Sequence, residues 1–179
     1  FKSYPRTFES DIQLCETLNV DSIFFPKQEA LYPETPPLTH VTVSHLSEQF
    51  CGKSRPLFFS GVTNVVLRLF NIIQPTHAFF GEKDFQQFCI IKQMVSDLFL
   101  PITLICCPIV RQSNGLALSS RNTYLSEQEQ EDATTIYKAL THIQLLFHEN
   151  SSLSSEALLN EFRSSLHPTI TIDYVSIVN

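Results

Sequence analysis

One stretch of this chain decides its fold: HAFFGEKDFQQFCIIKQMVSDLFLPITLICCPIV, residues 77–110. The run HAFFGE at 77–82 favours a β-strand, and the run PITLICCPIV at 101–110 favours a second one. Between them, the segment 85–98 places apolar residues at helical spacing. The positions expected to face inward are Phe88, Ile91, Val95 and Leu98. A strand, a helix and a strand in this order predict two parallel strands joined by a crossover helix.

The same alternation extends toward the N-terminus. Residues 60–73 have helical spacing, and Thr7 to Asn19 predict another helix. The expected inward face of the first is Val62, Val65, Val66, Leu69 and Ile72. The run VDSIFFP at 20–26 predicts a buried strand, whereas 27–58 is rich in loops, with part of 41–50 helical. The chain is therefore expected to be α/β, with a parallel sheet covered by helices.

The character of the chain changes after the second predicted strand. Ser126 and Glu129 form a capping-box pattern ahead of a long helix that is expected to reach about residue 148. A second helix is expected from about Ser154 to Leu166, followed by a strand over 169–178. Turn residues at 111–115 mark a boundary. The predicted domains are residues 1–112, which hold the parallel sheet, and residues 113–179, a small α+β C-terminal subdomain.

The composition excludes several classes of protein. The chain has 179 residues, of which 43% are apolar and 17% charged, as in globular proteins. Its net charge of −6 argues against a nucleic-acid partner, and it has no apolar run long enough to cross a membrane. The five cysteines show no Cys-x-x-Cys spacing, which indicates buried, reduced thiols in a cytosolic protein. Both ends look cut, so a segment of a longer polypeptide or a truncated copy is expected.

The first polar cluster is GEKDFQQ at 81–87, where a predicted strand ends and a helix begins. Ligands of open α/β sheets bind beyond the carboxyl ends of the strands, close to helix N-termini. Gly81 would let a ribose or phosphate approach the backbone, Lys83 would carry charge to a polyphosphate, and Asp84 could accept from ribose hydroxyls. Gln87 could donate to a substrate carboxylate or hydroxyl. Taken singly, an Asp at the position of Asp84 more often caps a helix, and a Lys such as Lys83 more often lies solvated on the surface.

The second cluster is GLALSSRN at 115–122. Two adjacent hydroxyls, from Ser119 and Ser120, and the fork of Arg121 can surround phosphate oxygens. The alternative interpretation is a turn followed by a helix N-terminus, since Ser and Asn favour such places. Each cluster is ambiguous alone, and together they favour an anion site.

The residues of these clusters also carry a family resemblance. RPLFFSGV (55–62), NIIQPTHAFFGEKDFQQ (71–87) and PIVRQSNGLALSSRNTYLS (108–126) follow the pattern of the pantothenate synthetase family nearly in order and spacing. YPRT (4–7) and the pair Tyr32-Pro33 resemble earlier landmarks of that family. The resemblance covers almost the whole chain. It implies a Rossmann-like nucleotidyltransferase fold with a signature H-x-G-H, and ATP-dependent condensation of pantoate with β-alanine through a pantoyl adenylate, releasing AMP and pyrophosphate.

The resemblance also implies roles for individual residues. The ATP-binding residues would be Gly81, Glu82, Lys83, Asp84, Val110, Leu118, Ser119, Ser120 and Arg121. Val110 would meet the adenine through its backbone, and 118–121 would close over the phosphates. Catalysis would rest on Lys83, Ser119, Ser120 and Arg121. Gln87 would hold pantoate. Mg²⁺ would share the phosphate charge; no ligand is assigned to it, and Asp11 is a weak candidate.

The sequence departs from the family pattern in three ways. H-x-G-H is absent, and in the family it lies upstream of Phe1, as does the pantoate-binding Gln of N-P-x-Q-F. Phe58 stands where the family usually has His, and Ala30 replaces an acid that usually precedes a M-Y-P motif. The expectation is an active cytoplasmic ligase, a homodimer, whose other segments lie outside this chain; the chain alone is expected to be inactive. The alternatives are a decayed copy acting at most as an interaction module, and an adenylyltransferase for another small carboxylate.

Overall fold

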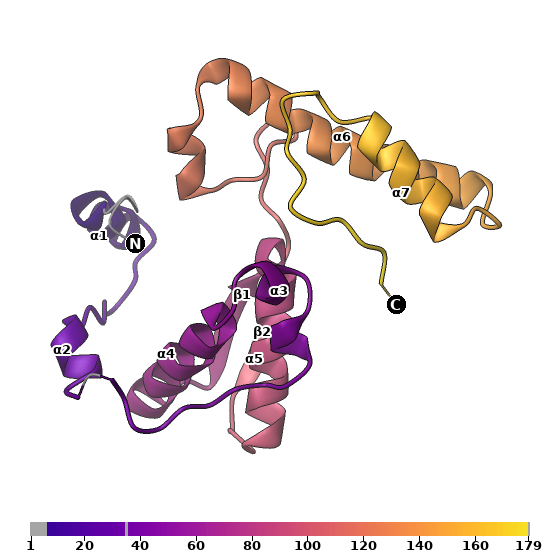
Figure 1. Ribbon diagram of the computed structural model, residues 1–179. Coiled ribbons are helices and arrows are strands. Elements are labelled where there is room, and N and C mark those ends of the chain that lie inside the picture. The colour runs from indigo at the N-terminus through magenta and orange to yellow at the C-terminus, as the bar shows by residue number, and fades with distance from the viewer. Residues whose placement is uncertain (1–6, 35, 179) are drawn as a thin grey trace.

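The computed structural model describes residues 7–34 and 36–178 (Figure 1). Its centre is a two-stranded parallel sheet made of β1 (His77–Gly81) and β2 (Thr103–Cys107). The register pairs His77 with Thr103 and Gly81 with Cys107, so both strands end at the same edge. The helix α5 (Phe85–Asp97) connects them. The predicted strand–helix–strand unit and the α/β class with a parallel sheet are thus confirmed.

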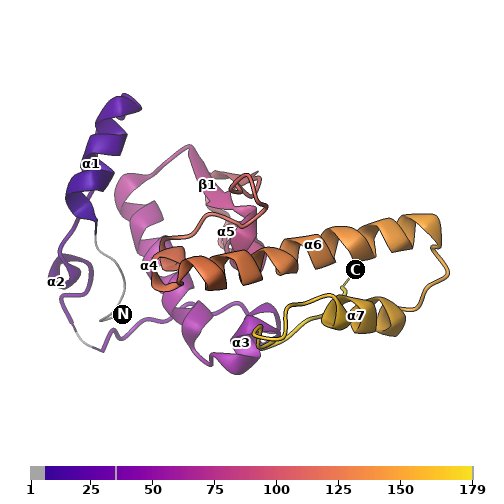
Figure 2. The same cartoon turned by 90° about the horizontal axis from the view of Figure 1, so that it is seen from above.

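Two helices cover the sheet and form the core with it. These are α5 and α4 (Phe58–Ile73), which lie side by side in Figures 1 and 2. The buried apolar residues of this core are Val43, Phe59, Phe70, Ile90, Ile91, Met94 and Val95. The buried residues of α5, Ile90, Ile91, Met94 and Val95, form one broad face of the helix, which packs against this core. Apolar residues of the strands, such as Ala78, Phe80 and Leu104, pack against this cluster.

The predicted inward faces of the two helices are right in part. In α5, Ile91 and Val95 are buried as expected, but Leu98 is 44% exposed because it is the cap that ends the helix. In α4, the buried residues are Phe59, Thr63 and Phe70, with Val62 and Val66 partly buried beside them. Ile72 is 53% exposed. The α4 face is therefore rotated toward Phe59, a residue that lies before the predicted start of the helix.

Two predicted strands are wrong. Residues 20–26 and 169–178 form no strand, and β1 and β2 pair only with one another among the described residues. Both runs have the β-branched and aromatic residues of a strand, yet a strand also needs a neighbour to satisfy its backbone groups. Phe25 remains 70% exposed. The described part of residues 113–179 is accordingly helical, not α+β.

The N-terminal segment carries helices that precede the core. The predicted helix at 7–19 is confirmed as α1 (Phe8–Thr17), which has no buried residue. Short helices interrupt the predicted loop region: α2 (Gln28–Leu31), η1 (Leu46–Glu48) and α3 (Cys51–Ser54). Arg68 of α4 donates to the Leu31 carbonyl at 2.8 Å and lies over the Tyr32 ring, which fixes α2 to α4.

The C-terminal part consists of η3 (Ser120–Tyr124) and two long helices, α6 (Glu127–Glu149) and α7 (Ser155–Ser164). The predicted capping box is present: Ser126 accepts from the Glu129 N–H, and the Glu129 carboxylate accepts from the Ser126 N–H. Leu158 and Phe162 of α7 are buried. Both helices begin within about a residue of their predicted starts, because the capping residues are local in sequence.

The five cysteines are free, as predicted, but each is partly exposed rather than buried. None of the helices formed by the described residues has the length and apolar character to cross a membrane.

Acid should weaken the C-terminal part through Asp132, a buried carboxylate of α6. The pKa of Asp132 is held below its ordinary value by a hydrogen bond from Gln128, and further by Thr169 and the His167 ring nearby. Its stabilising contribution is therefore present above the ordinary carboxyl pKa and is lost as pH falls through the lowered pKa. We expect denaturation midpoints of the wild type to fall more steeply than those of Asp132→Asn between about pH 5 and pH 2.

The matched control for this experiment is Asp21→Asn, which changes an exposed aspartate. Its curve should parallel that of the wild type. Parallel curves for Asp132→Asn and the wild type would contradict the assignment.

Candidate active site

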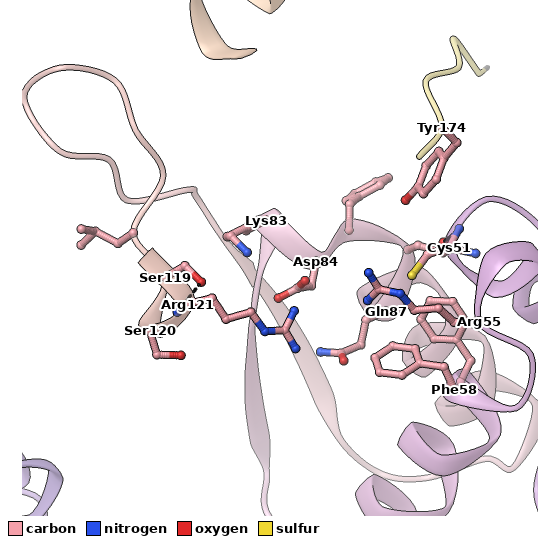
Figure 3. Close-up of a pocket in the computed structure, with 14 residues that line it drawn as sticks. Cys51, Arg55, Phe58, Lys83, Asp84, Gln87, Ser119, Ser120, Arg121 and Tyr174 are labelled. Atoms are coloured by element: carbon pink, nitrogen blue, oxygen red, sulfur yellow. Dashed lines mark hydrogen bonds between the residues drawn. The ribbon is translucent and has the colours of Figure 1, made fainter. Parts of the chain in front are cut away.

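A cavity of about 530 Å³ lies where the end of β1, the start of α5, the helix α3 and the segment 118–121 come together (Figure 3). Its lining residues are Cys51, Arg55, Phe58, Phe59, Lys83, Asp84, Phe85, Gln86, Gln87, Leu118, Ser119, Ser120, Arg121 and Tyr174. The two polar clusters found in the sequence thus face the same space. This is the edge of the sheet at which α/β proteins place their ligands.

The first cluster forms the floor of the cavity. After β1, a single 3₁₀ turn, η2 (Glu82–Asp84), leads into α5. Asp84 occupies the cap position of α5, but its side chain makes no capping hydrogen bond, so the carboxylate is left facing the cavity. Lys83 and Gln87 turn toward the same space in Figure 3. Asp84 is thus the N-cap of α5 by position, as the simpler interpretation predicts, but its side chain makes no capping bond.

The second cluster reaches the cavity on a tight hairpin. Arg111 and Ala117 form an antiparallel bridge, and Gly115 makes the turn with φ +95°, a conformation that favours glycine. The Arg111 guanidinium lies 3.8 Å from the centre of the Tyr137 ring, which holds the hairpin against α6. Beyond it, the Ser119 hydroxyl accepts from the Arg121 N–H at 3.2 Å and starts η3. The hairpin thereby turns 118–121 toward β1.

The cavity gathers positive charge. Its basic residues are Arg55, Lys83 and Arg121, whereas Asp84 is the only carboxylate among the described residues that line it. Throughout residues 7–34 and 36–178, none of the three cations forms an ion pair with a carboxylate. Unpaired cations that converge on one cavity, with serine hydroxyls beside them, suit a polyanion such as a nucleotide phosphate chain.

Three of the predicted ATP-binding residues do not line this cavity. Gly81 and Glu82 lie just before its floor, at the end of β1. A side chain at Gly81 would meet open space, so the backbone there is accessible from outside. Val110 lies at the base of the hairpin, 66% exposed, and its carbonyl accepts from the Leu118 N–H at 2.9 Å.

The sequence interpretation missed one wall of the cavity. Cys51 and Arg55 come from α3 and the residue that follows it, Phe59 from α4, and Tyr174 from the C-terminal segment. Arg55 could have been suspected as a cation in the quoted run RPLFFSGV. Tyr174 gave no local signal, because only the folded chain brings it to this wall. Phe58, the residue that departs from the family pattern, lies in the same wall and packs edge-on against Phe59.

Gln86 fixes this wall to α5. Its amide nitrogen donates to the carbonyls of Leu46 at 2.9 Å and Gln49 at 2.8 Å, and its amide oxygen accepts from the Cys51 N–H at 3.3 Å. One side chain thus satisfies three backbone groups of the segment that leads into α3. The neighbouring Gln87 faces the cavity instead.

We expect Gln86→Leu to lower the free energy of unfolding by about 1–3 kcal/mol, because three hydrogen bonds to the backbone are lost, one of them to the partly buried Cys51 N–H. Chemical denaturation monitored by circular dichroism measures this. Gln93→Leu, at an exposed position of the same helix, is the control and should cost much less. If Gln86→Leu were as stable as the control, these three hydrogen bonds would contribute nothing to the free energy of unfolding.

No cluster of three metal-binding side chains occurs in the described part of the chain. Asp11, the weak metal candidate, lies on α1, where its carboxylate accepts from the Thr7 hydroxyl at 3.1 Å. It is not part of the cavity lining. The residues Tyr4, Pro5 and Arg6 of the YPRT landmark fall outside the described residues.

The comparisons with known proteins agree with this geometry. The family model described as pantoate-beta-alanine ligase matches residues 1–179. The chain belongs to the pantoate–β-alanine ligase family. The predicted Rossmann-like nucleotidyltransferase class is confirmed with it.

Similar proteins are found among curated sequences and solved structures. The chain is 46% identical over 180 residues to the pantothenate synthetase of Caldicellulosiruptor bescii, covering 100% of this chain and 64% of that protein. It is 46% identical over 176 residues to that of Acinetobacter baylyi, covering 98% and 62%. A crystal structure of pantothenate synthetase from Thermus thermophilus superposes with a TM-score of 0.92 at 39% identity, covering 99% of this chain and 64% of the other.

A further crystal structure is that of pantoate-beta-alanine ligase from Francisella tularensis, complexed with beta-gamma ATP and beta-alanine. It superposes with a TM-score of 0.70 at 35% identity, covering 92% of this chain and 60% of the other. The chain thus spans slightly less than two thirds of the length of the relatives that it matches.

Proposed function

We propose that this chain is the part of an ATP-dependent ligase that binds the nucleotide phosphates and the acid to be activated. The complete protein condenses pantoate with β-alanine to give pantothenate, AMP and pyrophosphate. The observation that carries the proposal is the meeting of Lys83, Arg55 and Arg121 in one cavity without carboxylate partners among the described residues, in a chain of this family.

The reaction has two steps. A pantoate carboxylate oxygen attacks the α-phosphorus of ATP, the bond to the β-phosphate oxygen breaks, and pyrophosphate leaves. The β-alanine amine then attacks the acyl carbon of the pantoyl adenylate, AMP leaves with the acyl–oxygen electron pair, and the amine loses a proton. The chain needs to supply no covalent intermediate. Its contribution is to position the reactants and to stabilise negative charge as it develops on the phosphates.

The residues that line the cavity and those beside it share this work. Lys83 and Arg121 contact the phosphates, and the hydroxyls of Ser119 and Ser120 donate to their oxygens. Asp84 accepts from ribose hydroxyls, with Gly81 and Glu82 beside the ribose. The Val110 backbone meets the adenine, Leu118 belongs to the segment 118–121 that closes over the phosphates, and Gln87 holds pantoate. Arg55, on the opposite wall, supplies positive charge where the acid binds.

Mg²⁺ is expected to enter with ATP. Mg²⁺ is usually held by substrate phosphates and only one or two protein carboxylates, so it can enter with the nucleotide. The ion would neutralise part of the phosphate charge.

We place the nucleotide-binding domain at residues 1–112 and the C-terminal subdomain at 113–179, with the hairpin bridge of Arg111 and Ala117 at the junction. We also propose a cytoplasmic homodimer. The free cysteines support a reducing compartment, and the family resemblance supports the dimer.

The test is AMP release from ATP by the full-length polypeptide, with pantoate and β-alanine added singly and together. We expect stoichiometric AMP only when both acids are present, and pyrophosphate release already with pantoate. No AMP under any combination, from folded protein, would favour a decayed copy. AMP with another small carboxylate but not with pantoate would favour the related adenylyltransferase, which the ring of Phe58 in the cavity wall would then explain.

A further inference from the structure

The segment after α7 crosses the molecule toward α3, as Figures 1 and 2 both show. We call residues 167–174 the strap. Its first end is tied to α6: the His167 N–H donates to the Thr135 hydroxyl at 3.2 Å, and the Thr169 hydroxyl donates to the Asp132 carboxylate at 3.0 Å. This end is therefore anchored on α6, in part by the buried carboxylate of Asp132.

The other end of the strap is tied to the cavity wall. The Ser54 hydroxyl donates to the Asp173 carboxylate at 3.0 Å, a contact between residues 119 positions apart. Beside it, the rings of Phe50 and Tyr174 lie 6.1 Å apart between centroids. Two independent contacts thus hold the end of the strap against α3.

These contacts place Tyr174 in the cavity lining. Figure 3 shows its hydroxyl turned toward the cavity, on the same side as Cys51 and Arg55. Tyr174 is 49% exposed, so the ring packs on one side and is open on the other. Burial raises the pKa of the Tyr174 phenol above its ordinary value, so at neutral pH the phenol is a protonated hydrogen-bond donor.

We propose that Tyr174 contacts substrate: together with Arg55 it binds the carboxylate of a small acid on the wall opposite Lys83. A phenol donor beside a guanidinium matches the two oxygens of a carboxylate. Asp173 and Ser54 are positioning residues that hold Tyr174 there. This assignment rests on the proposed function, which supplies two such acids.

The strap also connects this contact with the phosphate side of the cavity. Gln130 of α6 donates to the carbonyls of Asn122 and Leu125, each at 3.2 Å, and so holds the segment that follows Arg121. Asp132, two residues along the same helix, holds Thr169. One turn of α6 therefore positions both Arg121 and Tyr174.

The test is binding of pantoate, β-alanine and ATP to the full-length protein, each measured by isothermal titration calorimetry. Tyr174→Phe should weaken the binding of one of the two acids by about tenfold or more, because a hydrogen bond to a charged group is lost, and should leave ATP binding unchanged. The control Tyr32→Phe makes the same change outside this cavity and should leave all three affinities unchanged. Equal affinities of the wild type and Tyr174→Phe for both acids would overturn the proposal.

Positioning by Asp173 is tested with a conservative pair. Asp173→Ala removes the acceptor of the Ser54 hydroxyl and should weaken the binding of the same acid, whereas Asp173→Asn keeps an acceptor oxygen and should restore it. Unchanged binding in Asp173→Ala, or weakened binding in Asp173→Asn equal to that of Asp173→Ala, would overturn the positioning role. Because calorimetry needs no turnover, a wild type that binds an acid but releases no AMP would refute the proposed function and still allow the role of Tyr174 to be measured.

Discussion

Lys83→Ala in the full-length protein should reduce adenylate formation by about 10²–10³-fold, with folding unchanged. Lys83 lies in the turn between β1 and α5, faces the cavity, and has no carboxylate partner among the described residues. Under the proposed function, its charge would be available to the phosphates as the bond to pyrophosphate breaks. Pyrophosphate release with ATP and pantoate measures this step, and circular dichroism checks the fold.

Lys92→Ala is the matched control, since Lys92 is exposed on α5 and does not line the cavity. Its rate should equal that of the wild type. Lys83→Arg keeps the charge and should retain more activity than Lys83→Ala. Near-normal turnover of Lys83→Ala would refute the role of this charge.

Ile91→Ala should lower the free energy of unfolding by about 2–5 kcal/mol. Ile91 is fully buried in the core between α4, α5 and the sheet, and the substitution removes apolar contacts and leaves a cavity. This is a large part of the total stability of a domain, which is about 5–15 kcal/mol. The measurement is the midpoint of urea denaturation, compared at an unchanged dependence of the unfolding free energy on urea concentration.

The exposed Lys92→Ala again serves as control, because it changes the adjacent position of the same helix. Its free energy of unfolding should change by less than about 0.5 kcal/mol. A cost for Ile91→Ala no greater than that of the control would mean that this core does not limit stability.

The parts of the fold that could be predicted from the sequence are those with local causes. The capping box of Ser126 and Glu129 starts α6 where the sequence places it, and the break between apolar runs at 82–84 separates β1 from α5. The strand expected at 20–26 failed because its formation depends on a partner strand, which no local pattern reveals. Ile90 was missed because the buried face of α5 also includes Ile90 and Met94 and is therefore turned relative to the face that the apolar spacing predicts.

The same distinction applies to the candidate site. Lys83, Ser119 and Arg121 stood out because they sit in short polar runs between apolar elements. Gln86 and Tyr174 did not, since their roles depend on contacts with residues 35 to 40 and more than 100 positions away. The cation of Arg55 was visible in the sequence, but its proximity to Lys83 required the folded chain.

The walls of the cavity come from residues 51 to 174, and the Ser54–Asp173 contact closes a loop of most of the chain. Contacts between distant residues form late in folding, because the entropy of closing long loops opposes them. The site should therefore be completed last, after the α4–α5 core and the α6–α7 pair are in place. A nucleotide that bridges these walls would then stabilise the chain as one cooperative unit, and a single cut between α7 and the strap would disconnect that unit without touching a charged residue of the cavity.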